Sequence, residues 1–107
     1  MRRLPVVLHE EAISDLEEIY RFVAERSGFP DLAWRFVERI RARCQRIGNA
    51  PHGGRLRQDL APGLRTVPFE RSAVITYLIE DDLVRVTNIF YGGRDYETLF
   101  ERGSPEE

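Results

Sequence analysis

The feature that most constrains the fold is a change of hydrophobic period near the middle of the chain. In residues 12–23 and 33–47 the apolar side chains recur every three or four positions, a spacing that lines one face of an α-helix. From residue 64 onward the apolar residues form runs rich in Val, Ile, Thr, Tyr and Phe, which favour β-strands. This order predicts two amphipathic helices followed by a sheet.

Helix-breaking residues indicate where each helix starts and stops. Two acidic residues follow His9, where the dipole of a first helical turn favours negative charge. Residues 27–30 end that helix with Gly and Pro, and we expect Asp31 to be the N-cap of the second helix. Gly48, with a proline shortly after it, stops the second helix. The short connection predicts an antiparallel helical hairpin.

Four strands are expected, and they predict a sheet for the hairpin to pack on. Residues 4–8 form a short apolar run before the first helix, and residues 51–62 form a polar loop after the second. Short polar turns then separate three strands, which should form an antiparallel meander. The expected fold is therefore α+β: an N-terminal strand and an antiparallel helical hairpin packed on a small antiparallel sheet. The three later strands span residues 64–69, 73–79 and 83–91.

The length of the chain, 107 residues, suits one small domain. We expect that domain to span residues 1–103, with one or two further helical turns in residues 95–100 and a frayed tail in residues 104–107. The sequence holds no apolar run long enough to span a bilayer or to act as a signal peptide. We therefore expect a cytoplasmic protein with no membrane role.

Charge is distributed in blocks along the chain. The formal net charge is −2, yet residues 35–71 hold nine Arg against three acidic residues, and both flanking segments are acidic. Every basic residue is Arg, whose planar fork pairs with carboxylate or phosphate. The basic middle segment could meet nucleic acid or an acidic protein segment. Alternatively, the Arg residues of the second helix could form its solvated face.

Several kinds of site are disfavoured by residue spacing. His9 and His52 are far apart, and no Cys/His or His/Glu spacing matches a zinc site, so we expect no metal. No Ser lies in a nucleophile-elbow context, and Gly53-Gly54 is too short for a phosphate-binding loop. Cys44 lies on the apolar stripe of the second helix, where an inert core thiol is expected.

A group of Arg residues on the predicted strands and loops remains as a candidate binding site. Strict alternation places Arg85 on the same strand face as Ile89 and Tyr91, and Arg65 likewise lies among apolar residues. Such a charge needs a partner, because an unpaired buried charge is costly. The partner could be an anion on another molecule or an internal carboxylate. The available internal carboxylates are those of Asp59, Glu80 and Asp95.

Two aromatic residues have alternative interpretations. Tyr91, which ends the last predicted strand, could be an aromatic at the edge of the core, a general acid or base, or a platform for stacking a nucleic-acid base. Trp34 lies near the turn between the helices, as Phe29 does. These two side chains could be exposed hydrophobic contacts for a partner, or they could seal the end of the core.

Short motifs in the same order and spacing resemble the ParE branch of the ParE/RelE toxins, the toxin halves of bacterial toxin–antitoxin pairs. The resemblance runs from about residue 11 to residue 99. At the last motif the family has His where this chain has Tyr91. The matching pieces are Ala12, Asp15, Leu16 and Ile19 in the first helix, then Cys44, Ile47, Pro51 and Gly54-Arg55, then Pro62-Gly63-Leu64-Arg65, Val74-Ile75-Thr76-Tyr77 and Tyr91-Gly92-Gly93-Arg94-Asp95.

The resemblance implies a plasmid-stabilisation type of toxin that inhibits DNA gyrase and needs no cofactor. It implies that the toxin is not an enzyme and does not itself bind a specific nucleic-acid sequence. A ParD-like antitoxin would neutralise it by wrapping over the hairpin and the sheet, in a higher-order hetero-oligomer. We expect contacts with the target from Arg55, Arg57, Tyr91 and Arg94. We expect contacts with the antitoxin from Arg65, Arg71, Arg85 and Trp34.

Two alternatives remain open. The RelE-like branch of the same superfamily consists of ribosome-dependent ribonucleases that cut messenger RNA. Those enzymes commonly place an Arg three residues before the sheet Tyr, where this chain has Val74. A third possibility is a non-toxic module that only binds its antitoxin. If the chain were a ribonuclease, its catalytic groups would be Arg55, Arg57, Arg65, Arg85 and Tyr91.

Overall fold

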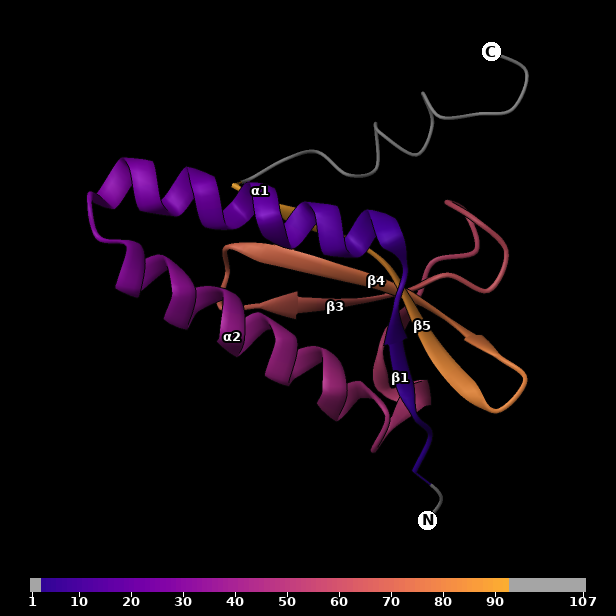
Figure 1. The fold of residues 1–107 in the computed structure, drawn as a ribbon. Helices are drawn as coiled ribbons and strands as arrows, with labels where there is room; N and C mark the ends of the chain where they lie inside the picture. The colour runs from indigo at the N-terminus through magenta and orange to yellow at the C-terminus, as the bar shows by residue number, and fades with distance from the viewer. Residues whose placement is uncertain (1–2, 93–107) are drawn as a thin grey trace.

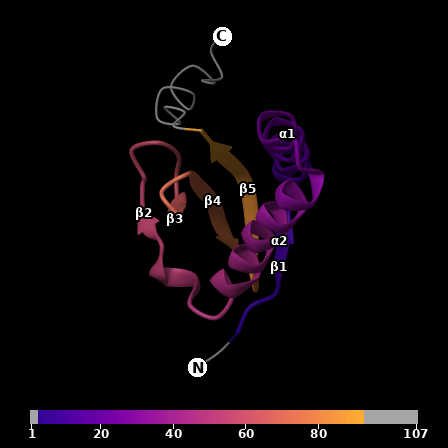
Figure 2. The same cartoon turned by 90° about the vertical axis from the view of Figure 1, so that its left-hand side faces the viewer.

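The computed structural model describes residues 3–92 of the chain. Helices α1 (Glu10–Ser27) and α2 (Pro30–Ile47) form an antiparallel hairpin that covers one face of a sheet (Figure 1, Figure 2). The sheet has the strand order β1-β5-β4-β3-β2, and a 3₁₀ turn, η1 (Pro51–Gly53), leads from α2 into it. The predicted α+β fold is confirmed. The strands are β1 (Val6–Leu8), β2 (Arg55–Leu56), β3 (Arg65–Phe69), β4 (Ala73–Glu80) and β5 (Leu83–Tyr91).

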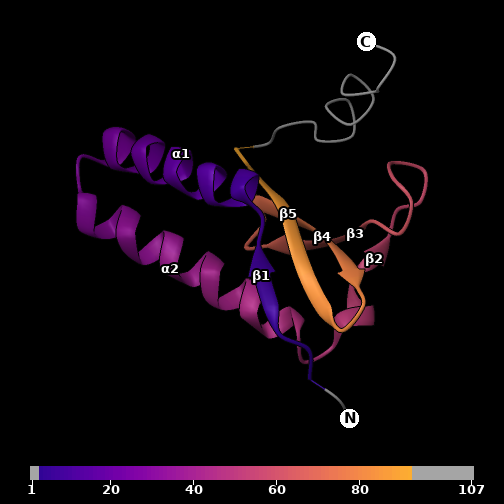
Figure 3. The same cartoon turned by 45° about the vertical axis from the view of Figure 1, so that its right-hand side comes forward.

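The sheet is mixed, which corrects the expectation of a wholly antiparallel one. Strands β2 to β5 pair antiparallel, but β1 runs parallel to β5, side by side with it (Figure 3). The reason is that the hairpin returns the chain to where it began: the amide of Leu4 donates to the carbonyl of Gly48 at 3.0 Å. From there β3, β4 and β5 alternate in direction, so β5 points the same way as β1.

Two local boundaries differ from the predictions. The N-cap of α2 is Phe29 and not Asp31, and Pro30 occupies the first turn of the helix. Pro suits that position because its missing N–H has no helical partner to lose. Inside the predicted polar loop, residues 55–56 form strand β2, which pairs with Thr66 and Arg65 of β3. A two-residue edge strand carries too few residues to show a periodicity in the sequence.

A β-bulge in β5 overturns the predicted face of Arg85. Thr76 pairs with Asn88 and Tyr77 pairs with Val86, so β5 has one extra residue at this point. The extra residue reverses the inward and outward alternation beyond it. As a result, the core-facing residues of β5 include Val84 and Val86 before the bulge and Ile89 after it. Arg85 therefore does not share a face with Ile89 or Tyr91.

The core lies between the hairpin and the two central strands. Leu16 and Ile19 of α1 and Ile40 of α2 contribute to a buried cluster with residues of β4 and β5. Fully burying one such aliphatic side chain contributes about 1.5–3 kcal/mol. Cys44 is fully buried in this cluster, and the loss of water raises the pKa of its thiol to about 12, which keeps it protonated and inert. The prediction of a core thiol is confirmed.

Asp15 joins α1 to the edge of β5 that β1 leaves uncovered. Strand β1 pairs only with residues 84–86 of β5. Beyond that point, the Asp15 carboxylate accepts a hydrogen bond from the backbone N–H of Ile89 at 2.8 Å and one from the side-chain amide of Asn88 at 3.3 Å. Asp15 thus satisfies a strand-edge donor and fixes the position of α1 over the sheet.

Replacing Asp15 with Ala should therefore destabilise the protein by about 1–3 kcal/mol, because the Ile89 N–H loses its charged acceptor. Urea unfolding followed by circular dichroism measures this difference. The control is Glu25→Ala, which changes an exposed carboxylate on the same helix and should leave the free energy of unfolding within about 0.5 kcal/mol of the original. Equal stabilities of the two variants would contradict the assigned role of Asp15.

Candidate functional site

Tyr77 holds the corner where α2 passes into the sheet. Its hydroxyl donates to the carbonyl of Pro51 at 2.7 Å and accepts from the N–H of Gly54 at 3.0 Å. A side chain at position 54 would overlap this hydroxyl, so the close approach requires Gly. Burial raises the pKa of Tyr77, which keeps the hydroxyl protonated and able to donate. The Gly-Arg motif of the sequence thus includes a structural glycine.

Arg65 fastens the same corner from β3. One terminal nitrogen of its guanidinium donates to the carbonyl of Gly54 at 2.9 Å and to that of His52 at 3.2 Å. Backbone oxygens, rather than one of the carboxylates considered from the sequence, therefore receive these hydrogen bonds from Arg65. The side chain binds η1 to the sheet, and this contact gives Arg65 a structural role whatever else it touches.

Arg57 and Arg85 each form an internal ion pair. Arg57, whose side chain is only 11% exposed, donates to both carboxylate oxygens of Asp59 at 2.9 and 2.7 Å. These hydrogen bonds lower the pKa of Asp59 below its ordinary value. Arg85 pairs with Glu80 at 2.6 Å. Two of the carboxylates proposed from the sequence as internal partners, those of Asp59 and Glu80, thus pair with Arg57 and Arg85.

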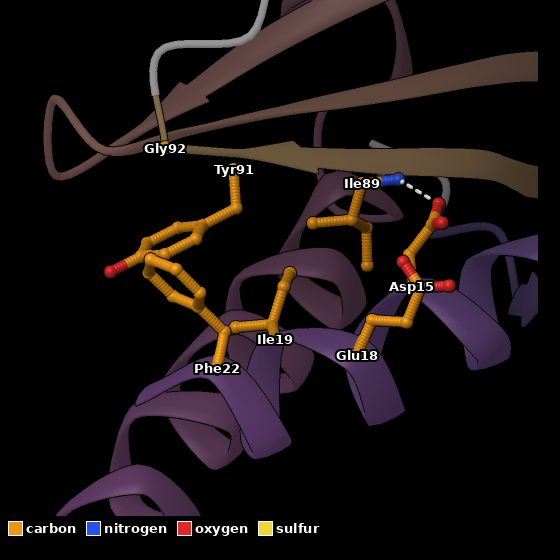
Figure 4. Close-up of a pocket in the computed structure, with 7 residues that line it drawn as sticks. All are labelled: Asp15, Glu18, Ile19, Phe22, Ile89, Tyr91 and Gly92. Carbon is orange, nitrogen blue, oxygen red and sulfur yellow. Dashed lines mark hydrogen bonds between the residues drawn. The ribbon is translucent and has the colours of Figure 1, made fainter. Parts of the chain in front are cut away.

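Tyr91 belongs to a row of aromatic rings at the hairpin end of the core. Its ring packs edge-to-face against Phe22 of α1, with 5.7 Å between the ring centroids (Figure 4). It also packs edge-to-face against Phe36 of α2, with 5.4 Å between the centroids. Phe36 in turn packs against Phe69 of β3. These contacts support the interpretation of Tyr91 as an aromatic at the edge of the core.

Of the other Arg residues predicted as contacts, two are exposed to solvent and one lies outside the described residues. Arg55 on β2 and Arg71 in the turn between β3 and β4 are exposed. Arg71 and the preceding Glu70 both adopt positive φ, and Glu70 forms a two-point ion pair with Arg39 of α2 at 3.0 Å. Arg94 lies outside the described residues, as do the helical turns expected in residues 95–100 and the tail expected in residues 104–107.

A groove with an apolar floor lies between α1 and α2. Its volume is about 740 Å³. Trp34 and Ile13 line it although they are 58% and 44% exposed, which leaves large apolar surfaces in water. Charged side chains of both signs form its rim. The groove is lined by Ile13, Leu16, Tyr20, Trp34 and Val37, with Glu17, Arg21, Glu38 and Arg41 at the rim.

Sequence reasoning singled out only Trp34 among the apolar residues of this groove as a contact for a partner. Leu16 and Tyr20 lie on the apolar spacing of residues 12–23, which predicts core positions, whereas Ile13 is not assigned to that stripe. The available signal was that Ile13 is a large apolar residue off the stripe, next to Ala12, which is fully buried. An apolar residue that widens a helical stripe indicates a second contact surface.

A smaller cavity of about 410 Å³ lies between α1 and the end of β5 (Figure 4). Asp15 and Glu18 supply carboxylates to its wall, and Phe22 and Tyr91 supply aromatic rings. Gly92, the last described residue, also lines it.

Residues 3–92 show no group of His, Cys, Asp and Glu that could hold a metal ion. None of the helices in this part of the chain is long and apolar enough to cross a membrane. The described residues form an apolar groove between the helices and ion pairs within the chain.

Replacing Tyr77 with Phe should cost about 1–2 kcal/mol of stability, because the carbonyl of Pro51 and the N–H of Gly54 both lose their partner. Chemical unfolding measures the change. Tyr20→Phe is a matched control, since it removes a hydroxyl from the groove between the helices and should leave stability nearly unchanged. A Tyr77→Phe variant as stable as the Tyr20→Phe variant would contradict the corner contact.

Comparison with known proteins identifies the family. Residues 6–96 match the family described as the ParE toxin of the type II toxin–antitoxin system parDE. Among solved structures, a chain from the chromosomal ParDE system of P. aeruginosa superimposes with a TM-score of 0.74 at 20% identity, over 83% of this chain and 96% of that one. This likeness shows a shared fold. A comparison with curated proteins gave no match. The family match covers most of the sequence, and the chain belongs to the ParE toxin family of type II toxin–antitoxin systems.

Proposed function

We propose that this protein is a toxin that inhibits DNA gyrase by direct contact, without catalysis, and that a ParD-like antitoxin neutralises it. Membership of the ParE family supports the assignment of both partners. The choice of gyrase rests on what the family implies, because no feature of the fold by itself points to that target. In this proposal the toxin acts in the cytoplasm and forms a hetero-oligomer with its antitoxin.

The observation that carries the antitoxin half of the proposal is the apolar groove between α1 and α2. Exposed apolar surface that is surrounded by charged groups is typical of a protein interface. Trp34 stands in the groove with more than half of its surface exposed, and Trp is enriched among residues that dominate binding energy. An amphipathic segment of the antitoxin could bury this surface with its own apolar face.

The state of the Arg residues supports action without catalysis. A ribonuclease that makes a 2′-hydroxyl attack a phosphate needs cations directed at that phosphate. Here the guanidinium of Arg57 faces Asp59, that of Arg85 faces Glu80, and that of Arg65 binds backbone carbonyls. Position 74 on β4 is Val, which cannot stabilise a phosphorane. These features disfavour the RelE-like alternative.

The proposed contacts of individual residues follow from their exposure. Arg55 is the exposed candidate for the target surface, and the ion-paired Arg57 supports the loop beside it. For the antitoxin, the proposal places Trp34 at the centre of the interface, with the exposed Arg71 available to its acidic residues. Arg85 would have to exchange its ion pair with Glu80 for one with the antitoxin. Arg65 would affect the binding of either partner indirectly, by fixing η1 against the sheet. Tyr91 would do so through its packing against Phe22 and Phe36.

The proposal predicts that the purified toxin, freed of antitoxin, abolishes DNA supercoiling by purified gyrase and traps cleaved DNA. The same preparation should not cut messenger RNA on translating ribosomes. Adding an equimolar amount of the antitoxin should restore supercoiling. Cleavage of messenger RNA without any effect on gyrase would instead establish the ribonuclease, and inactivity in both assays with intact antitoxin binding would indicate a non-toxic binding module.

Replacing Trp34 with Ala should weaken antitoxin binding at least tenfold, because the central aromatic contact of the groove is lost. Isothermal titration calorimetry with the antitoxin measures the affinity. The matched control is Phe29→Ala, which removes an aromatic side chain that is even more exposed, at 65%, and does not line the groove. Equal affinities of the two variants would place the antitoxin elsewhere on the molecule.

A further inference from the structure

Four arginine residues form a row along one side of α2. They are three or four residues apart, so they lie on the same side of the helix and span about 16 Å along its axis. Arg39 shows which way this side faces, because its guanidinium reaches Glu70 in the turn after β3, whereas α1 lies on the other side of α2 (Figure 2). The α2 Arg row consists of Arg35, Arg39, Arg43 and Arg46.

Three members of the row have no ion pair among residues 3–92. No carboxylate in this part of the chain pairs with Arg35, Arg43 or Arg46. Glu38 of the same helix pairs instead with Arg41, on the side of the groove, at 4.0 Å. Arg35 and Arg46 are exposed, and Arg43 is partly exposed. Three positive charges on one side of α2 are therefore available to an anionic partner.

The two helices of the hairpin carry opposite charge. Helix α2 has five Arg against two acidic residues, whereas α1 has two Arg against six acidic residues. The formal net charge of −2 thus conceals a cationic surface on α2. Packed helix axes are about 8–10 Å apart, so the acidic groups of α1 lie at about a Debye length or more from the row and are largely screened from it by salt.

The composition of this surface favours nucleic acid over protein as the partner. Protein interfaces have an apolar centre in which charged groups are depleted, whereas interfaces with DNA are more polar and much more positively charged. The large exposed apolar side chains of residues 3–92 include none between positions 35 and 46. Phe36 lies under the guanidinium of Arg39 and packs against Phe69 of β3. The planar fork of Arg suits the oxygens of a phosphate group.

We propose that the α2 Arg row binds the phosphate backbone of duplex DNA through Arg35, Arg43 and Arg46. Phosphate contacts carry no sequence information, so this binding is independent of base sequence. The choice of duplex DNA over RNA rests on the proposed function, because gyrase acts on duplex DNA, and the row would hold the toxin against that DNA. The row and the groove lie on different sides of α2, so an antitoxin in the groove would leave the row accessible.

Fluorescence anisotropy with a short labelled DNA duplex tests the row, using the purified toxin freed of antitoxin and no gyrase. Each phosphate contact contributes about 0.9 to the slope of log affinity against log salt concentration, so three contacts predict a slope of about −2.7. The affinity should therefore fall about fortyfold between about 50 and 200 mM KCl. Arg35→Gln, Arg43→Gln and Arg46→Gln should each make the slope shallower by about 0.9.

A matched control separates the row from a general effect of net charge. Arg26→Gln removes an exposed Arg from α1 and changes the net charge by the same amount. It should leave both the affinity for the duplex and the slope unchanged. The three row variants should bind the antitoxin as tightly as the original protein in isothermal titration calorimetry, because the groove is intact. Circular dichroism confirms that each variant is folded.

Absence of duplex binding, or a slope that the three row substitutions leave unchanged, would overturn the proposal. Tighter binding to single-stranded RNA than to the duplex would also overturn it. If the toxin does not bind DNA and the row variants bind the antitoxin more weakly, the row pairs with an acidic segment of the antitoxin instead.

The supercoiling assay separates this inference from the proposed function. Inhibition of gyrase by a toxin that does not bind the duplex would refute the DNA contact and leave the proposed function intact. Salt-dependent duplex binding through the row, without any effect on gyrase, would support the DNA contact and refute the proposed target.

Discussion

The fold depends on the contact between the apolar stripes of the helical hairpin and strands β4 and β5. Neither layer can bury its apolar face alone, so the two form one core in which Ile40 of α2 and Ile75 of β4 are fully buried. Strand β5 is central to this arrangement, because it contacts β4, β1 and α1 at once. The groove between the helices and the cavity beside β5 both exist because this contact fixes where α1 lies.

Internal pairing decides what the Arg-rich middle of the chain can do. The guanidinium groups of Arg57, Arg65 and Arg85 each bind an oxygen atom of the same chain. Arg39 of α2 pairs with Glu70, which lies in the turn after β3. Guanidinium groups engaged in this way hold loops and strand ends in place. In the proposed function, the surfaces that contact partners consist of apolar groups such as Trp34 and exposed cations such as Arg55. This division of roles is consistent with a protein that acts by binding other proteins.

Much of the fold could be predicted from the sequence, because periodicity and turn residues act locally. Helix α1 and strand β5 follow the predicted spans closely, and the hairpin and the antiparallel meander are confirmed. The bulge in β5, the parallel partner β1 and the short strand β2 could not be predicted in this way. Each of them depends on how separate segments pair in the folded sheet, as when Val6 of β1 pairs with Val84 of β5.

For the candidate site, the sequence by itself determined the residue types, the uneven charge and the family resemblance, and the family match confirms that resemblance. It could also name Trp34, since a large apolar residue near a helical turn is visible without coordinates. Only the tertiary structure decided that Ile13 joins Trp34 in one groove, that Arg85 lies on the face opposite Ile89, and that Arg65 binds the backbone of η1. The physical reason is that side-chain pairing and strand faces are set by which distant segments pack together, and local sequence preferences do not specify that packing.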